Sequence, residues 1–286
     1  MDLIELYTKC DLTKKTDKLV AISALAKEAY GLQQCRYLAG LWERDLIFEL
    51  GWMSHMTHLP TLRLKNGQEL PIDYDDQGEE QCTTKILYRA PSWSWASVDG
   101  HVTYPYDDEN IGSCNIYPLI SDIIPWVRHR TEDLYGQVIY GDLTISARVI
   151  MVTLTNNSTV GRVERVDRTT RVTVCGIDVL TPGSVCRDHL NGIFRPDSDE
   201  VLLMPLLLSF IGTDGFLFIA LLLEHTKLRN VYKRVGALNW QGDKAALERD
   251  PGLDFILSSA GKIQWDGGSC VLFQRDMSRL QKIKIV

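Results

Sequence analysis

One apolar stretch, residues 201–223 (VLLMPLLLSFIGTDGFLFIALLL), constrains the fold more than any other part of the chain. It is long enough to cross a membrane as a helix, but Pro205 and the sequence Gly212-Thr213-Asp214-Gly215 interrupt it. Each half has the length of a strand, and the polar centre is typical of a hairpin turn. We therefore predict two buried strands joined by a turn, and no membrane span.

The rest of the chain changes from a helical to a strand-like pattern. Apolar residues recur at helical spacing in two stretches, which predicts helices from Thr16 to Gly31 and from Tyr37 to Met56. After Tyr88 strand patterns dominate, as in the alternating residues 143–151. Helices followed by a run of strands predict an α+β fold, in which N-terminal helices pack on a large, mainly antiparallel β-sheet or barrel.

The domain organisation follows from the same change. Residues 1–58 form a helical segment and residues 87–286 a β-rich region, and we expect the two to fold as one domain. Between them, residues 59–86 are polar, which predicts a long mobile loop. The acidic run at 73–80 (DYDDQGEE) lacks the ligand spacing of a calcium loop, so we expect a solvated segment there.

Charge and cysteine content exclude several classes of function. The net charge is −6 without any basic run, which argues against a nucleic-acid partner. Seven irregularly spaced cysteines without a CxxC pair favour reduced thiols over a zinc site or a disulfide framework. The N-terminal residues lack the apolar core of a signal peptide. We expect a cytoplasmic protein without metal or cofactor, and the sequence leaves its oligomeric state open.

Motifs of common catalytic machinery are missing. The chain has no GxSxG elbow, no phosphate-binding GxxxxGK[ST] and no GxGxxG segment. His55 and His58 lie near the end of the second expected helix, but no third metal ligand accompanies them, so two partly exposed histidines are expected. Asp45 and Glu49 form an i,i+4 carboxylate pair. Ordinary helix surface is the favoured interpretation for that pair, and a paired-carboxylate base stays open.

Two tryptophans stand two residues apart in the segment APSWSWAS (90–97). In an extended strand, Trp93 and Trp95 would lie on the same face. Two interpretations stay open: both indoles belong to the core, which is favoured, or they form the aromatic wall of a pocket. If the second expected helix packs on this strand, four indoles would frame one cavity: Trp42, Trp52, Trp93 and Trp95.

Four segments occur in a characteristic order: residues 16–26 (TDKLVAISALA), 37–42 (YLAGLW), 90–97 (APSWSWAS) and 232–236 (YKRVG). In this order they resemble the C-terminal half of fungal heterokaryon-incompatibility (HET-domain) proteins, and the resemblance spans most of the chain. Complete members carry a preceding HET core with a segment like ALSYxWG, and nothing like it occurs here. The chain is then a fragment or a stand-alone protein, and we expect the second.

The resemblance implies a function, because stand-alone HET-like proteins occur in fungal natural-product pathways. The chain is similar to norbornene-forming Diels–Alderases of sordarin-type diterpenoid biosynthesis. An intramolecular [4+2] cycloaddition needs no nucleophile, metal or cofactor. It needs an apolar cavity that folds diene onto dienophile, with hydrogen-bond donors to an activating carbonyl. The implied activity is a cofactor-independent pericyclase for a small hydrophobic terpenoid, with Trp42, Trp52, Trp93 and Trp95 at the pocket and Tyr88, Arg89 and His101 as candidate catalytic donors.

Two other classes of function stay open. The chain is alternatively a non-catalytic regulatory or interaction module derived from a heterokaryon-incompatibility protein. A hydrolase or transferase whose residues assemble only in the fold is the third hypothesis. A closed apolar pocket of roughly several hundred Å³ near Trp93 and Trp95 would favour the enzyme. Solid packing there, with an exposed apolar patch elsewhere, would favour the interaction module.

Overall fold

The computed structural model describes most of the chain. The described residues are 2–10, 12–55, 61–63, 69–71, 88–105, 115–156, 170–174, 177–179, 184–187, 199–211, 215–243, 245, 249, 256–257, 261–266, 269–275 and 280–286. The expectations for His58 and for the acidic run 73–80 fall outside these residues. Within the expected loop 59–86, the short strands β4 (Thr61–Arg63) and β5 (Glu69–Pro71) pair with each other, and the other residues of the loop also fall outside.

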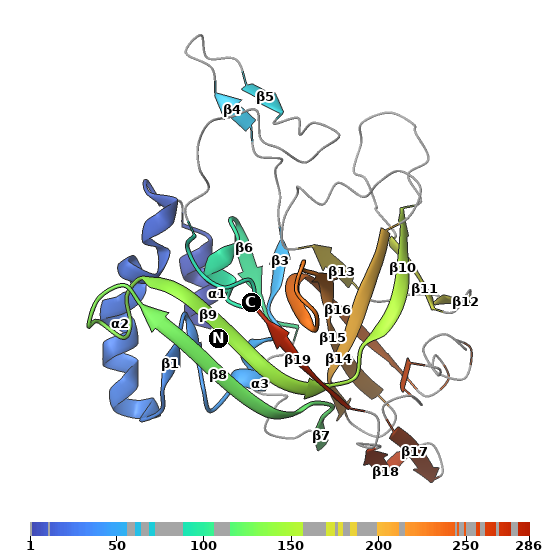
Figure 1. Cartoon of the computed structure of the whole chain (residues 1–286). Coiled ribbons are helices and arrows are strands. Elements are labelled where there is room, and N and C mark those ends of the chain that lie inside the picture. The colour runs from blue at the N-terminus through green and yellow to red at the C-terminus, as the bar shows by residue number, and fades with distance from the viewer. Residues whose placement is uncertain are drawn as a thin grey trace.

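An eleven-stranded, mainly antiparallel sheet forms the body of the molecule (Figure 1). Its hydrogen-bonded order is β12-β11-β10-β14-β15-β16-β19-β9-β8, while β7 pairs with β14 and β13 pairs with β16. Among the described strands the order stays open from β12 to β8, so the expected α+β class is confirmed with a sheet that is not closed into a barrel. The strands are β7 (Asn115–Pro118), β8 (Ser121–His129), β9 (Val138–Ala147), β10 (Ile150–Asn156), β11 (Thr170–Val174), β12 (Ile177–Val179), β13 (Ser184–Arg187), β14 (Asp199–Ile211), β15 (Gly215–His225), β16 (Val231–Asp243) and β19 (Gln281–Ile285).

The apolar stretch 201–223 forms the predicted pair of buried strands, β14 and β15. Alternate side chains of β15 enter two separate core clusters, because the sheet is covered on both faces at this point. Leu217, Ile219 and Leu221 belong to one cluster, and Phe216 and Phe218 to the other. Because both faces of β15 are buried, this part of the apolar stretch shows no alternation of apolar and polar residues. No helix in the described part of the chain is long and apolar enough to cross a membrane.

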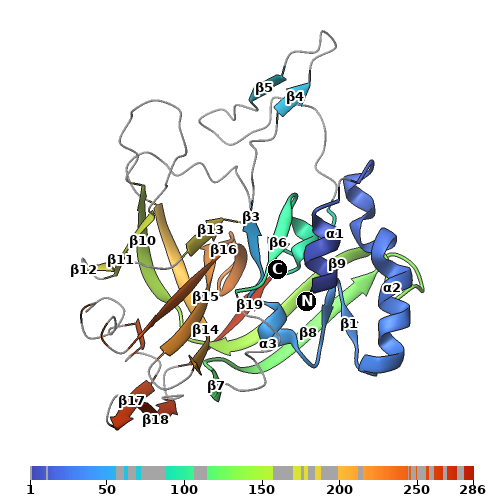
Figure 2. The same cartoon turned by 180° about the vertical axis from the view of Figure 1, so that it is seen from behind.

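The helices gather at the end of the sheet formed by β8 and β9, as both views show (Figures 1 and 2). They are α1 (Asp2–Thr8), the 3-10 turn η1 (Lys15–Asp17), α2 (Lys18–Gln33) and α3 (Leu46–Glu49). The first expected helix is confirmed as α2, but its ends differ. Thr16 lies in η1 and does not cap the helix, and α2 continues past Gly31. It ends where Gln34 adopts a left-handed φ of 47° and donates its N–H to the Tyr30 carbonyl.

The second expected helix, from Tyr37 to Met56, is wrong. A hairpin of β1 (Tyr37–Leu38) and β2 (Leu41–Trp42) stands there, followed by the single turn α3 and by β3 (Met53–His55). Ala39 and Gly40 both have positive φ, 50° and 106°, which is the backbone of a two-residue hairpin turn. The apolar stripe that suggested a helix is nevertheless largely buried: Leu38, Leu41, Leu46, Leu50 and Met53.

The expected strand around Trp93 and Trp95 is wrong as well. The chain turns after Pro91, and Trp95 begins the 3-10 turn η2 (Trp95–Ser97). Ser94 caps this turn, because its hydroxyl accepts a hydrogen bond from the Ala96 N–H at 3.0 Å. Both indoles are fully buried in the larger core cluster, as the core interpretation predicted. A strand follows only at β6 (His101–Thr103), which pairs with β3, while β17 (Gly261–Asp266) and β18 (Ser269–Arg275) form a separate hairpin.

Candidate functional site

The paired-tryptophan segment holds the β1–β2 hairpin in place. The Ser94 hydroxyl donates to the Ala39 carbonyl at 2.5 Å, and the Trp95 Nε1 donates to the Gly40 carbonyl at 2.8 Å. A Cβ at Gly40 would lie 2.8 Å from that same indole nitrogen, so the close approach requires glycine. The segments 37–42 and 90–97, which are far apart in sequence, therefore form one packed unit.

A buried arginine from β16 completes this unit. The Trp52 Nε1 donates to the Trp93 carbonyl at 2.9 Å, and the Arg234 guanidinium stacks over the Trp52 ring with Cζ 3.4 Å from its centroid. Arg234 also donates to the carbonyls of Leu50, at 2.6 Å, and of Trp52. The Arg234 side chain is fully buried, and these acceptors offset part of the cost of removing its charge from water. Trp52 and Trp93 thus lie within packed structure.

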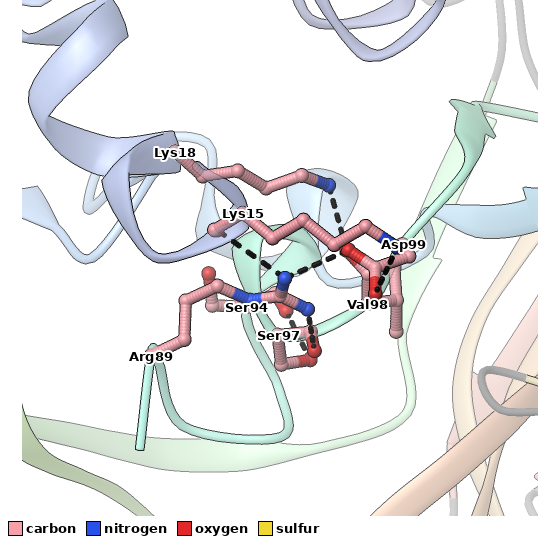
Figure 3. A network of polar contacts seen from close by, with 7 residues as sticks. All are labelled: Lys15, Lys18, Arg89, Ser94, Ser97, Val98 and Asp99. Atoms are coloured by element: carbon pink, nitrogen blue, oxygen red, sulfur yellow. Dashed lines mark hydrogen bonds and ion pairs between the residues drawn. The ribbon is translucent and has the colours of Figure 1, made fainter. Parts of the chain in front are cut away.

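Arg89 lies in a polar network that ties the start of α2 to residues 97–99 (Figure 3). Its guanidinium pairs with Asp99 at 2.7 Å and donates to the Ser97 carbonyl at 2.5 Å. The buried Lys18 ammonium donates to the Val98 carbonyl at 2.6 Å, and Lys15 pairs with Asp99 at 3.5 Å. Burial, followed by the charge of Arg89, lowers the pKa of Lys18 to about 8. This network uses Arg89 to join structural segments.

The other two candidate donors also lie away from the cavity described next. Tyr88 is 45% exposed, and its hydroxyl lies by the Gly141 backbone and near Tyr140. His101 lies in β6, where it pairs in register with His55 of β3. Neither residue, nor Arg89, is among the described residues that line the cavity.

A cavity of about 440 Å³ lies between α1, α2, the β1–β2 hairpin and α3. This volume falls within the roughly 300–1,000 Å³ range of small-molecule sites. Two contacts hold α1 against it: the Tyr7 hydroxyl donates to the Lys18 carbonyl at 2.7 Å, and Glu5 accepts the Tyr104 N–H at 2.9 Å. The walls are mostly apolar and aromatic, and the described lining residues are Leu3, Ile4, Ile22, Leu25, Ala26, Ala29, Tyr37, Gly40, Trp42, Asp45, Phe48, Glu49 and Tyr104.

The hairpin supplies an aromatic wall to this cavity. Tyr37 and Trp42 are direct partners across β1 and β2, so their side chains share one face, with ring centroids 4.9 Å apart. Tyr135, from the loop between β8 and β9, also contacts Tyr37, with ring centroids 5.6 Å apart. Of the four indoles that the sequence suggested for a pocket, Trp42 is the one among the described lining residues.

Glu49 places a carboxyl group in the wall. Its Oε2 accepts the Trp42 N–H at 2.5 Å, and Asp45, the N-cap residue of α3, lies four residues before it. Burial raises the pKa of Glu49 to about 8, against the opposing effect of the Trp42 N–H, and the Asp45 charge raises it further. At neutral pH the Glu49 carboxyl is therefore mostly a neutral acid. The carboxylate pair noted in the sequence lines the cavity rather than an ordinary helix surface.

The sequence-based criterion for an enzyme was a closed apolar pocket near Trp93 and Trp95, and the structure meets this criterion only in part. Trp93 and Trp95 are fully buried and are not among the described lining residues, yet the cavity begins at Gly40, whose carbonyl Trp95 binds. Sequence reasoning missed Tyr37, Phe48 and Tyr104 as lining residues. The sequence signal that pointed to the cavity was the Asp45–Glu49 pair inside an otherwise apolar stretch.

Searches for metal sites and for known relatives add no assignment. In the described residues, no group of three or more His, Cys, Asp or Glu is placed to hold a metal ion. Cys10 and Cys35 are free thiols. No family model matches the chain, and no curated protein or solved structure is significantly similar to it.

Proposed function

We propose that the chain is a cytoplasmic, cofactor-independent pericyclase that binds a hydrophobic terpenoid in the cavity beside α3 and accelerates its intramolecular [4+2] cycloaddition. The observation that carries the proposal is the cavity itself. It has a suitable volume of about 440 Å³, a wall with the paired rings of Tyr37 and Trp42, and a carboxyl group whose pKa burial raises to about 8. The order of segments that resembles HET-domain proteins supports the same class of enzyme.

Confinement supplies the catalytic effect in this proposal. A flexible terpenoid must lose torsional freedom before its diene and dienophile meet, and a cavity that binds the folded conformer removes that cost from the reaction step. Tyr37 and Trp42 are suited to this role because each ring is held by neighbours on the scaffold. Ser94 and Trp95 contribute indirectly, by fixing the hairpin that carries this wall.

The test uses a terpenoid with a tethered cyclopentadiene and an α,β-unsaturated aldehyde as dienophile. The purified protein should raise the rate and change the stereochemical ratio of the cycloadduct relative to buffer. Ala29→Trp fills the cavity and should return both quantities toward the buffer values. Ala24→Trp, on the exposed side of α2, is the matched control and should react as the wild type does. A wild-type rate and stereochemistry equal to the buffer control would refute the pericyclase.

A second candidate function is the non-catalytic interaction module, and one surface favours it. Ile124 and Trp126 are exposed on β8, and Trp126 contacts the exposed Tyr140 of β9 with ring centroids 5.3 Å apart. Trp126→Ser distinguishes the two functions. It should leave the cycloaddition unchanged if the protein is an enzyme. If the protein is an interaction module, no acceleration occurs and the substitution should abolish co-purification with a partner.

A further inference from the structure

Among the polar groups of the described cavity wall, which also include Asp45, Tyr37 and Tyr104, Glu49 has a carboxyl group bonded to the scaffold. Glu49 Oε2 is already bonded to the Trp42 N–H, so this oxygen faces the protein backbone. A neutral carboxylic acid has one hydroxyl proton to donate. With Oε2 serving as acceptor, Oε1 is the atom that can carry that proton toward a ligand in the cavity.

The charges around Glu49 decide which ligand can be accepted. Asp45, the N-cap residue of α3, raises the pKa of Glu49 through its charge, while burial raises the pKa values of the Tyr37 phenol of β1 and the Tyr7 phenol of α1. Tyr104, which follows β6, also lines the cavity. The positive charge of the amino terminus acts on Glu49 in the opposite direction to Asp45. None of the described lining residues is Lys, Arg or His, so no described side chain of that wall would neutralise an anionic ligand.

We propose that the Glu49 carboxyl donates a hydrogen bond to the carbonyl oxygen of an α,β-unsaturated aldehyde or ketone, and that the cavity rejects the matching carboxylate. The assignment rests on the proposed function, since such a bond withdraws electron density from the dienophile and is strengthened as the cycloaddition proceeds. Glu49 is then the catalytic donor. Asp45 acts through it as a positioning residue, because its charge adds to the effect of burial in keeping the proton on Glu49.

Three ligands with the same hydrocarbon chain should differ in affinity for the cavity, because their polar groups differ in charge. An aldehyde accepts the Glu49 proton and carries no charge. A carboxylate would place a second negative group beside Asp45, with no Lys, Arg or His among the described lining residues to pair with it and with its hydration lost. An ammonium would instead bind an ionised Glu49 and stack on the aromatic wall. The ranking of the three affinities therefore reports the protonation state of the site.

The experiment measures binding of farnesal, farnesoic acid and farnesylamine by quenching of tryptophan fluorescence, at pH 6.5 to 9. At pH 6.5 to 7, farnesal should bind at least tenfold more tightly than farnesoic acid, and its affinity should fall as the pH rises through about 8. Glu49→Leu should weaken farnesal binding about tenfold and abolish the pH dependence, whereas Glu49→Gln keeps an amide donor and should lose only the pH dependence. Asp45→Asn should move the fall in affinity to lower pH. Ala24→Trp is the control for folding and fluorescence.

The results separate this inference from the proposed function. Farnesoic acid or farnesylamine binding as tightly as farnesal at pH 7, or an affinity for farnesal that does not change with pH in the wild type, would overturn the role of Glu49. If farnesal binding follows the expected pattern but the tethered substrate is not accelerated, the pericyclase fails and the carbonyl-binding site stands. If cycloaddition proceeds equally in wild type and Glu49→Leu, the pericyclase stands and Glu49 is not its donor.

Discussion

Replacing Glu49 by Gln should remove a pH dependence of stability that the cavity imposes on the wild type. Burial raises the pKa of the Glu49 carboxyl from 4.5 to about 8. The folded chain therefore keeps a proton that the unfolded chain loses as the pH rises through this interval. Because the folded state binds more protons there, the free energy of unfolding must fall with rising pH. The stabilisation is complete below about pH 4.5 and is lost above about pH 8.

The size of the effect follows from the same two values. Each unit of difference in pKa corresponds to about 1.36 kcal/mol, so the interval from 4.5 to about 8 sets an upper limit of about 5 kcal/mol. Water entering the cavity beside the carboxyl would reduce this figure, since solvation stabilises the charged form. The expected slope is up to about 1.4 kcal/mol per pH unit between pH 5 and 7.5.

The assay is urea unfolding of wild type and Glu49→Gln, followed by circular dichroism at several pH values from 5 to 8. Gln has nearly the same shape and no titratable group, so the difference between the two free energies isolates Glu49 from every other carboxyl and histidine. This difference should decline steadily as the pH rises. A difference that is constant across the range would show that the carboxyl titrates normally, and the reasoning about the cavity would be refuted.

Three further predictions concern the scaffold. Gly40→Ala should lower the melting temperature, because its Cβ would lie 2.8 Å from an indole nitrogen at a φ of +106°. The control Gly31→Ala, in open space on α2, should raise stability by up to about 1 kcal/mol, and equal effects of the two substitutions would contradict the role of the turn. Arg234→Met should cost at least about 2 kcal/mol in urea unfolding, because two buried carbonyls lose a donor, whereas Lys233→Met at the exposed neighbour should change stability by less than about 0.5 kcal/mol. Lys18 has a pKa lowered from 10.5 to about 8, so the free energy of unfolding of the wild type should rise relative to that of Lys18→Met as the pH increases from about 8 to 10.5. This gain should be lost again as the pH falls through 8, and parallel pH profiles of the two proteins would argue that the ammonium is not desolvated.

Strands and helices with a strong local pattern could be predicted from the sequence. The pair β14–β15 and the helix α2 were both expected, because burial on one or two faces imposes a periodicity that is visible in the residues themselves. The same argument failed for residues 37–56. There the buried leucines recur at helical spacing, but a turn with two positive φ values divides the segment into a hairpin and a single helical turn.

The paired tryptophans show a similar limit. Their spacing fits one face of a strand, and their burial was correctly favoured, but Ser94 caps a 3-10 turn instead. Hydrogen bonds to Ala39, Gly40 and Trp52 stabilise that turn, and these partners lie 41 to 55 residues away in the chain. Contacts at such separation leave no local pattern, so the sequence cannot distinguish the strand from the turn.

For the candidate site as well, one part could be predicted from the sequence and another part could not. By itself, the sequence determined that Asp45 and Glu49 are four residues apart within an apolar stretch, and that the chain carries enough apolar residues for an α+β core. Only the tertiary structure decided that α1, α2 and the β1–β2 hairpin meet α3 around one cavity, with Glu49 in its wall. Desolvation depends on every element that excludes water from a group, and for Glu49 those elements come from separate parts of the chain. The pKa of Glu49, and the chemistry proposed for it, is therefore a property of the assembled fold.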